Sequence, residues 1–135
     1  DAAKVHKKAL TFREALLRIF YAVIRGDEPD NRDMDIFNNT LPGTMKHLKL
    51  SPNDRTFSLD WKEKGVHLDK ILWPVVKDAL DLLTSDLLSR VSRCGDEKCG
   101  WLYLDTSRNR SRRWCDMKDC GNRAKVKRHY RRSKK

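Results

Sequence analysis

Four cysteines in two close pairs are the residues whose type and spacing most clearly indicate chemistry. Cys94 and Cys99 form one pair and Cys115 and Cys120 the other, in the arrangement C-x4-C-x15-C-x4-C. Each pair can supply two thiolates from one tight loop, and the insert between the pairs can bring the two loops together around a tetrahedral Zn²⁺. The spacing therefore predicts one structural zinc ion bound by all four thiolates, which leaves no open coordination position for a catalytic water.

The sequence around each pair predicts the local structure of a zinc finger. The segments "VSRC" and "WLYLD" are typical of short strands on either side of the first pair, and the second pair leads into the helical segment "NRAKVKRHYRR". Asn122 is available as the N-cap of that helix. A glycine follows the second cysteine of each pair and allows the positive φ that a sulfur-binding loop often needs. A hairpin knuckle followed by a knuckle at a helix start predicts a treble-clef-like zinc finger.

Other uses of four thiols stay open at this point. Two disulfides would also account for two close pairs, but no signal-peptide pattern opens the chain, and clustered cysteines without a secretion signal favour metal. Redox-active or unrelated buried thiols are the further alternatives. We expect the neighbouring aromatic residues Trp101, Tyr103 and Trp114 to fill the small core around zinc, and stacking on nucleic-acid bases is the alternative.

The excess positive charge of the chain lies in the same region. Residues 90–135 contain 16 of the 30 Lys and Arg residues but 5 of the 19 Asp and Glu residues, so they account for the whole formal net charge of +11. Ten of these 16 are arginine, whose planar guanidinium suits phosphate and guanine. Cations four residues apart on a helix repel one another, and an anionic partner would relieve that cost. The predicted nucleic-acid-binding residues are Arg108, Arg110, Arg112, Arg113, Arg123, Lys125, Lys127, Arg128, Arg131 and Arg132.

A solvated basic helix and tail, kept only for solubility, is the alternative to a binding surface. Val126 and Tyr130 indicate a fixed helix instead, because an apolar pair four residues apart can pack onto the zinc core. We expect only the last residues, "SKK" at 133–135, to be a loose tail.

The first 89 residues predict a mostly helical domain with one small hairpin. Apolar residues spaced three and four apart predict helices at about 5–23, from about residue 32, and at 68–83, with Gly26 as the C-cap of the first. Pro42 is expected to kink or shorten the second helix, and the third helix either begins near Pro74 or kinks there. The segment "SPND" between two alternating apolar runs indicates a β-hairpin.

No catalytic constellation can be assembled from these residues. The first 89 residues have no glycine-rich phosphate loop and no nucleophile motif, and His6, His47 and His67 lack metal-ligand spacing. The longest apolar run, "KILWPVVKDALDLLTSDLL", is interrupted by charges and is unsuited to a membrane span. We therefore expect a cytoplasmic protein that is not an enzyme.

Residues 94–132, "CGDEKCGWLYLDTSRNRSRRWCDMKDCGNRAKVKRHYRR", resemble the CGNR zinc finger family, named for the motif that stands here as Cys120-Gly121-Asn122-Arg123. Residues 3–92, including "FREALLRIF", are similar to the later part of the helical ABATE domain that usually precedes this finger. From this resemblance we expect the opening segment of full-length members to be missing here, and the sequence to be a fragment or processed form of a longer protein.

The resemblance implies a bacterial, stress-induced transcriptional regulator whose zinc finger binds DNA and whose zinc is held by the four cysteines. It divides the chain into a partial ABATE-like helical domain, residues 1–92, and a CGNR zinc finger with a basic C-terminal helix, residues 93–135. We therefore expect a mostly α-helical protein with small β-hairpins, one structural Zn²⁺, and double-stranded DNA as partner. RNA binding is the alternative, as is a protein-docking zinc module coupled to a helical domain that senses a small molecule.

Overall fold

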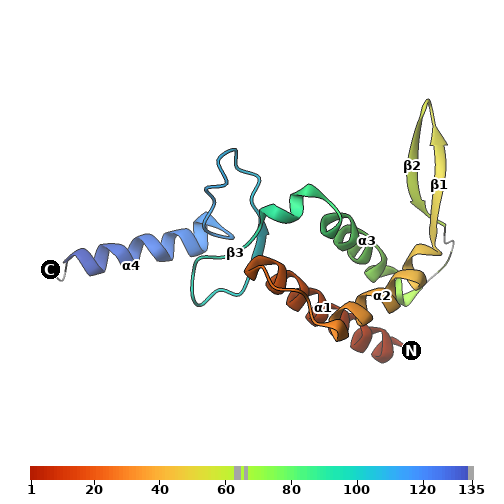
Figure 1. Ribbon diagram of the computed structural model, residues 1–135, viewed down its shortest axis with the longest axis horizontal. Helices are drawn as coiled ribbons and strands as arrows, with labels where there is room; N and C mark the ends of the chain where they lie inside the picture. The colour runs from red at the N-terminus through yellow and green to blue at the C-terminus, as the bar shows by residue number, and fades with distance from the viewer. Residues whose placement is uncertain (63–64, 66, 134–135) are drawn as a thin grey trace. The chain divides into compact units, whose positions relative to one another are not determined.

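The computed structural model describes residues 1–62, 65 and 67–133 and forms two compact units, Asp1–Ser85 and Asp86–Lys135 (Figure 1). The described part of the chain is mostly helical, and its strands form two separate two-stranded antiparallel sheets. The predicted fold class, a mostly α-helical chain with small hairpins, is confirmed.

The first helix, α1 (Ala2–Arg25), ends where the sequence predicts. The Asp1 carboxylate caps its start by accepting a hydrogen bond of 3.1 Å from a backbone N–H in the first turn. Gly26 ends it in the left-handed conformation, with φ of 77°, which glycine adopts easily because it lacks a Cβ. One face of the helix is buried and includes Phe12 and Ile19.

The second helix, α2 (Asn31–Met45), runs through Pro42 for almost one more turn. Asp30 is its N-cap, and after the proline the N–H of Lys46 still donates to the carbonyl of Pro42 at 3.2 Å. Pro42 is exposed to solvent. The proline nevertheless removes one helical hydrogen bond, because it has no N–H to donate to the carbonyl of Asn38.

Strands β1 (Leu48–Asn53) and β2 (Thr56–Trp61) form the predicted hairpin, but its turn lies later in the sequence than predicted. The residues "SPN" belong to β1, and the turn is made by Asp54 and Arg55, with φ of 35° and 72°. Two adjacent turn residues with positive φ match the right-handed twist of paired strands, which explains the shifted turn.

The predicted helix over 68–83 is divided in two. A short 3₁₀ helix, η1 (Leu68–Ile71), leads into α3 (Leu72–Leu83). Pro74 is the third residue of α3, in the first turn, where a missing N–H costs no helical hydrogen bond. The helix therefore begins just before its proline and does not need to kink there.

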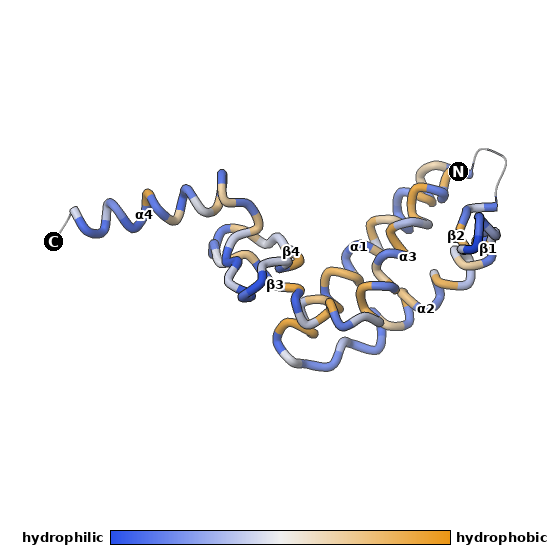
Figure 2. The backbone as a smooth tube through the Cα atoms, turned by 90° about the horizontal axis from the view of Figure 1, so that it is seen from above, coloured by the Kyte–Doolittle hydropathy of each residue, from blue (hydrophilic) through white to orange (hydrophobic). Residues whose placement is uncertain are grey.

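The three α-helices of the first unit bury one hydrophobic core, and Figure 2 shows hydrophobic positions recurring along α1 and α3. The rings of Phe12 and Phe37 lie 5.5 Å apart at its centre. This core contains no cysteine, so the first unit has a source of stability independent of any metal. Its buried members are Phe12, Ile19, Phe37, Val76 and Ala79.

The second unit contains little regular structure apart from its last helix. It begins with a 3₁₀ helix, η2 (Asp86–Arg90), and an antiparallel strand pair, β3 (Val91–Arg93) and β4 (Leu102–Leu104), at the predicted places. A π-helical turn, η3 (Met117–Gly121), then continues into α4 (Asn122–Ser133). The cysteines lie on the loop between β3 and β4 and on the approach to α4.

Candidate metal centre and basic surface

The first cysteine pair lies on a tight turn at the end of the β3–β4 hairpin. The N–H of Cys94 donates to the carbonyl of Trp101 at 2.9 Å, which extends the strand pairing by one residue. The N–H of Cys99 donates to the carbonyl of Asp96 at 2.9 Å and closes the turn. The hairpin thus fixes both cysteines of the pair on one small loop.

Gly95 allows the second cysteine loop to approach the first. Its N–H donates to the carbonyl of Arg113 at 2.8 Å. A Cβ added at Gly95 would lie 3.0 Å from that carbonyl oxygen and 3.2 Å from the Trp114 ring. A Cβ here would force its neighbours to shift by a few tenths of an ångström, so the close approach of the loops favours glycine.

The four cysteine sulfurs form one cluster in which all Sγ atoms lie within 4.8 Å of one another. Cys115 Sγ is 3.7 Å from that of Cys99 and 3.6 Å from that of Cys120. Tetrahedral Zn²⁺ with Zn–S bonds of about 2.3 Å places its sulfurs roughly 3.8 Å apart, so the cluster fits one zinc ion. A disulfide needs sulfurs about 2.0 Å apart, and all four thiols are free, so the geometry favours a shared metal.

Hydrogen bonds and burial act in opposite directions on the thiols. Burial raises the pKa of Cys94. Hydrogen bonds from the backbone N–H groups of Asp96 and Cys115 outweigh burial, so the pKa is lowered from its usual value to about 7. The Cys115 N–H nitrogen lies 3.4 Å from Cys94 Sγ. Burial raises the pKa of Cys115 and raises that of Cys120 to about 12. Because zinc binds thiolates, its binding to this set of sulfurs releases protons.

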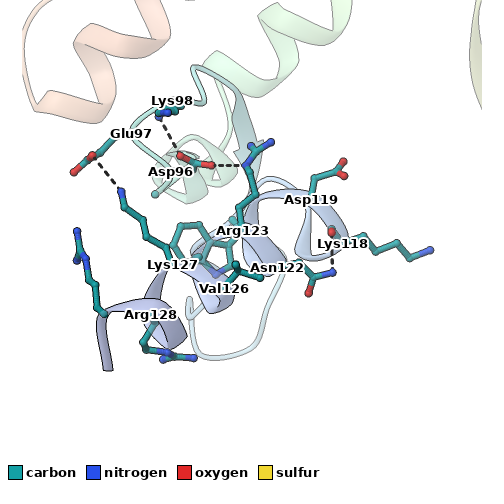
Figure 3. Close-up of a pocket in the computed structure, with 14 residues that line it drawn as sticks. Asp96, Glu97, Lys98, Lys118, Asp119, Asn122, Arg123, Val126, Lys127 and Arg128 are labelled. Carbon is teal, nitrogen blue, oxygen red and sulfur yellow. Dashed lines mark hydrogen bonds and ion pairs between the residues drawn. The ribbon is translucent and has the colours of Figure 1, made fainter. Parts of the chain in front are cut away.

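Arg123 of α4 links the two cysteine loops. Its Nη2 donates to Cys120 Sγ at 3.0 Å. Its Nε donates to Asp96 Oδ2 at 2.9 Å (Figure 3). The N–H of Lys98 and the Arg123 guanidinium both lower the pKa of Asp96. A guanidinium between a carboxylate and a sulfur favours the thiolate and ties the start of α4 to the first loop.

The second cysteine pair enters a helix earlier than the sequence predicts. Asp116, and not Asn122, is the N-cap: its carboxylate accepts from the N–H of Lys118 at 2.6 Å. Asn122 has helical φ and ψ of −66° and −42°, and its side-chain amide donates to the carbonyl of Lys118 at 2.8 Å. The predicted cap is wrong because the π-helical turn brings helical geometry forward to Met117.

The positive φ predicted for the glycine after Cys99 and for the glycine after Cys120 is also wrong. Neither glycine is among the described residues with positive φ.

The arginine-rich loop, residues 105–114, is organised by a buried carboxylate that sequence reasoning missed. Asp105 is 3% exposed and accepts hydrogen bonds from the N–H and hydroxyl of Ser107, at 2.9 and 2.5 Å, and from the N–H of Arg112 at 3.1 Å. The bond from the Ser107 hydroxyl contributes most to lowering the pKa of Asp105. In the sequence, the spacing Asp-x-Ser indicates this role of Asp105, because it is typical of an Asx turn.

Arg112 is used inside the finger. Its guanidinium donates to the carbonyls of Trp114, at 2.9 Å, and of Cys115. Its Cζ lies 4.7 Å from the centroid of the Tyr103 ring, and Tyr103 Oη donates to the carbonyl of Arg112 at 2.5 Å. This residue therefore joins β4 to the approach of the second cysteine pair.

The three aromatic residues near the cysteines differ in their burial. Trp114 packs against the cysteine cluster as predicted. Tyr103 is half-buried against Arg112, whereas Trp101 is 73% exposed. The prediction of a core position is therefore wrong for Trp101, although its carbonyl accepts a hydrogen bond from the N–H of Cys94.

Helix α4 is held at its start and is exposed along the rest of its length. Val126 and Tyr130 are 54% and 64% exposed, so the predicted packing of this pair on the zinc core is wrong. The helix contacts the finger mainly through η3 and its first turns, and hydrophilic positions predominate along it (Figure 2). Ser133 ends α4, and residues 134–135 of the predicted tail lie outside the described residues.

All ten cations predicted to bind nucleic acid are exposed, and their partners divide them into groups. Arg123 and Lys127 face the acidic residues of the first loop, with Lys127 Nζ 3.9 Å from Glu97 Oε2 (Figure 3). Arg112 is bonded to loop carbonyls, and Arg110 Nη2 lies 3.5 Å from Ser89 Oγ. Six have no side-chain hydrogen bond or ion pair to any described residue: Arg108, Arg113, Lys125, Arg128, Arg131 and Arg132.

Two family models together cover nearly the whole chain. One, described as "CGNR zinc finger", matches residues 90–133. The other, ABATE, described as "Putative stress-induced transcription regulator", matches residues 1–86. The chain belongs to the ABATE family. Its C-terminal unit is a CGNR zinc finger, called the CGNR finger below. No curated protein sequence matches the chain.

The family membership and the sulfur cluster agree on a class of function. Neither family is one of enzymes, and four clustered cysteines in a CGNR finger fit a zinc-binding site. Together they support a zinc-binding regulatory protein. Among the described residues, no helix is both long and apolar enough to span a membrane.

Proposed function

We propose that this protein is a DNA-binding transcription regulator whose CGNR finger contacts the duplex through its arginine-rich loop and α4. One zinc ion, with Cys94, Cys99, Cys115 and Cys120 as ligands, would supply a fixed tetrahedral centre that joins the β3–β4 turn to the start of α4. The basic side chains then occupy set positions on a folded finger. The family description, a transcription regulator, favours duplex DNA over RNA.

The observation that carries this proposal is a helix whose cations are left without acids. On α4, Lys125, Arg128, Arg131 and Arg132 are exposed, and none has an acidic partner among the described residues. Repulsion between these charges lowers the stability of the helix in isolation. A nucleic-acid backbone relieves the repulsion and releases its own condensed counterions, which adds to the affinity.

Fluorescence anisotropy with a labelled random duplex and a labelled RNA hairpin, repeated across a salt series, tests this function. The expected result is duplex binding that weakens by roughly 10³-fold or more between 50 and 200 mM salt if six or more phosphates are contacted. Tighter binding of the RNA at every salt concentration would replace DNA by RNA as the partner. Zinc-loaded protein that bound neither would leave the protein-docking alternative.

A matched pair of variants locates the surface. Arg108→Gln with Arg132→Gln removes two charges from the CGNR finger, whereas Arg13→Gln with Arg25→Gln removes two from α1, where each is paired with an acid. Because steering by remote charges is weak at moderate salt, we expect the finger variant alone to lose roughly tenfold or more in affinity. Equal losses in both variants would contradict the assignment of binding to the finger. Arg112 is unsuitable for this test, because its guanidinium supports the loop.

A further inference from the structure

We infer that a hollow beside the start of α4 is a binding site for one backbone phosphate of nucleic acid, formed by Arg113, Lys125 and Arg128. The hollow has a volume of about 280 Å³ and is lined by these three cations together with the neighbouring Trp114 and Ala124. The inference rests on the proposed function and specifies where on the CGNR finger one phosphate is held.

The floor of the hollow is part of the finger's core. Trp114 packs against the buried cysteine cluster, and Gly121 and Ala124 complete the floor from the helix side. A Cβ at Gly121 would lie 2.5 Å from Sδ of Met117 in the same helical turn, so the Met117 side chain lies against Gly121 and also lines the hollow. Gly121 and Ala124 add little bulk of their own to the hollow between the three cations.

The cations around the hollow are anchored on different elements. The carbonyl of Arg113 accepts from the N–H of Gly95 at 2.8 Å, and its guanidinium carbon lies 5.5 Å from the Trp114 ring centroid. Lys125 and Arg128 are three residues apart on α4 and therefore project on the same side of the helix. The loop and the helix thus direct positive charge into one space before any ligand arrives, which reduces the entropy cost of binding.

Acidic side chains line a larger neighbouring hollow, which shares Arg128 with the smaller one. That larger hollow, of about 810 Å³, is lined by Asp96, Glu97 and Asp119 (Figure 3). In Figure 3, Lys127 reaches toward Glu97, whereas Arg128 extends away from it. No Asp or Glu lines the smaller hollow among the described residues, so no acid in its lining offsets the three cations.

A phosphate is the anion that this set of donors fits best. The two guanidiniums can each present a pair of parallel N–H donors, and the lysine adds a mobile ammonium. Contacts to phosphate carry no base sequence directly, but they fix the register and orientation of a protein on its duplex. The hollow would therefore position the finger, while the arginine-rich loop remains available for base edges.

Two double variants of equal charge test the site in the full zinc-loaded chain. Lys125→Gln with Arg128→Gln removes two cations from the hollow, and Lys118→Gln with Lys127→Gln removes two from the acidic side. We expect the first pair to weaken binding of a random duplex roughly tenfold and to reduce the salt slope by about 1, equally for different sequences. The second pair should change the affinity less than about threefold at moderate salt, because exposed charges far from the contact are screened.

The outcomes separate this inference from the function on which it rests. If the parent binds DNA but the two double variants lose equal affinity, the phosphate site is wrong and the proposed function stands. If the parent binds no nucleic acid, the proposed function fails, and titration with inorganic phosphate decides the site alone. Amide resonances of Gly121, Ala124 and Lys125 should then shift in the parent and not in Lys125→Gln with Arg128→Gln; unshifted parent resonances would overturn the inference.

Discussion

Arg123 is one of ten exposed cations that the sequence assigns to nucleic-acid binding, yet its hydrogen bonds are directed into the metal centre. It donates to Cys120 Sγ and to the Asp96 carboxylate, at 3.0 and 2.9 Å. Its pKa is raised by these partners, the Asp96 bond first, so it stays charged wherever the thiolates form. We regard Arg123 as a positioning residue for zinc, because a cation next to a thiolate compensates charge that the metal alone does not neutralise.

The zinc affinity of Arg123→Ala tests this role. Outer-shell partners of metal ligands typically contribute about 10–100-fold to affinity, and we expect a loss of that size. Competition with a chromophoric chelator measures the affinity, and the thiolate-to-metal absorption of the Co²⁺ form reports on the ligand geometry. Lys127→Ala is the matched control, since it removes a cation from the same helix row but lies 3.9 Å from Glu97 and contacts no sulfur. If both variants held zinc equally, Arg123 would be only one more surface charge.

At the scale of elements, the sequence predicts the elements well but not the places where they join. The steps of three and four between apolar residues predict α1 and α3, since that spacing directly determines which face is buried. Cysteine spacing likewise predicts the cluster of four sulfurs, because few arrangements bring four thiols together. The π-helical turn before Asn122 has no such signal, since it depends on how the second cysteine loop closes onto the first.

The least predictable part of the site is the bonding inside the arginine-rich loop. Arg112 and Arg113 are adjacent and chemically identical, but one donates to backbone carbonyls and the other lines a hollow. Their difference follows from Asp105, whose buried carboxylate accepts the Arg112 N–H and thereby sets the course of the loop. Composition shows a cluster of arginines; only the three-dimensional loop separates structural cations from those left for a ligand.

Pro42 offers a test of what stabilises α2, because the helix contains this proline at the expense of some stability. The ring is exposed, and the helix loses one hydrogen bond. Replacing proline by alanine inside a helix gains about 3 kcal/mol, and the more flexible unfolded chain offsets about 0.4–1 kcal/mol of this. We expect Pro42→Ala to raise the free energy of unfolding by roughly 1–2 kcal/mol, since the site lies near the helix end. Urea unfolding followed by helical circular dichroism measures it.

A substitution at the next residue, Gly43, provides a reference value for this change in the free energy of unfolding. Gly43 is also inside α2, and a Cβ there would meet nothing within 4 Å. Gly43→Ala should therefore add about 0.5–1 kcal/mol through backbone entropy alone. A Pro42→Ala protein less stable than its parent would show that the proline makes a contribution beyond helix geometry.

At the scale of the whole molecule, the two units have different sources of stability. The first unit buries Phe12, Phe37 and Val76 between three helices. The buried cluster of the second unit consists of three cysteines, with Trp114 and Cys115 packed against it. So small an apolar cluster is far below what usually holds a domain of about 50 residues, and such modules depend on metal binding for their folding. Removal of zinc should therefore affect one unit and leave the other.

Hydrogen exchange with and without a strong chelator tests this division in the full chain. After zinc removal, we expect peptides from β3, β4 and α4 to exchange at least tenfold faster, because local unfolding then costs little free energy. Peptides from α1, α2 and α3 should keep their protection, since their core contains no cysteine. Zinc added back should restore the protection of the finger and, with it, the binding of DNA. If all peptides lost protection together, the two units would form one cooperative structure; if none did, the thiol cluster would hold the finger without metal.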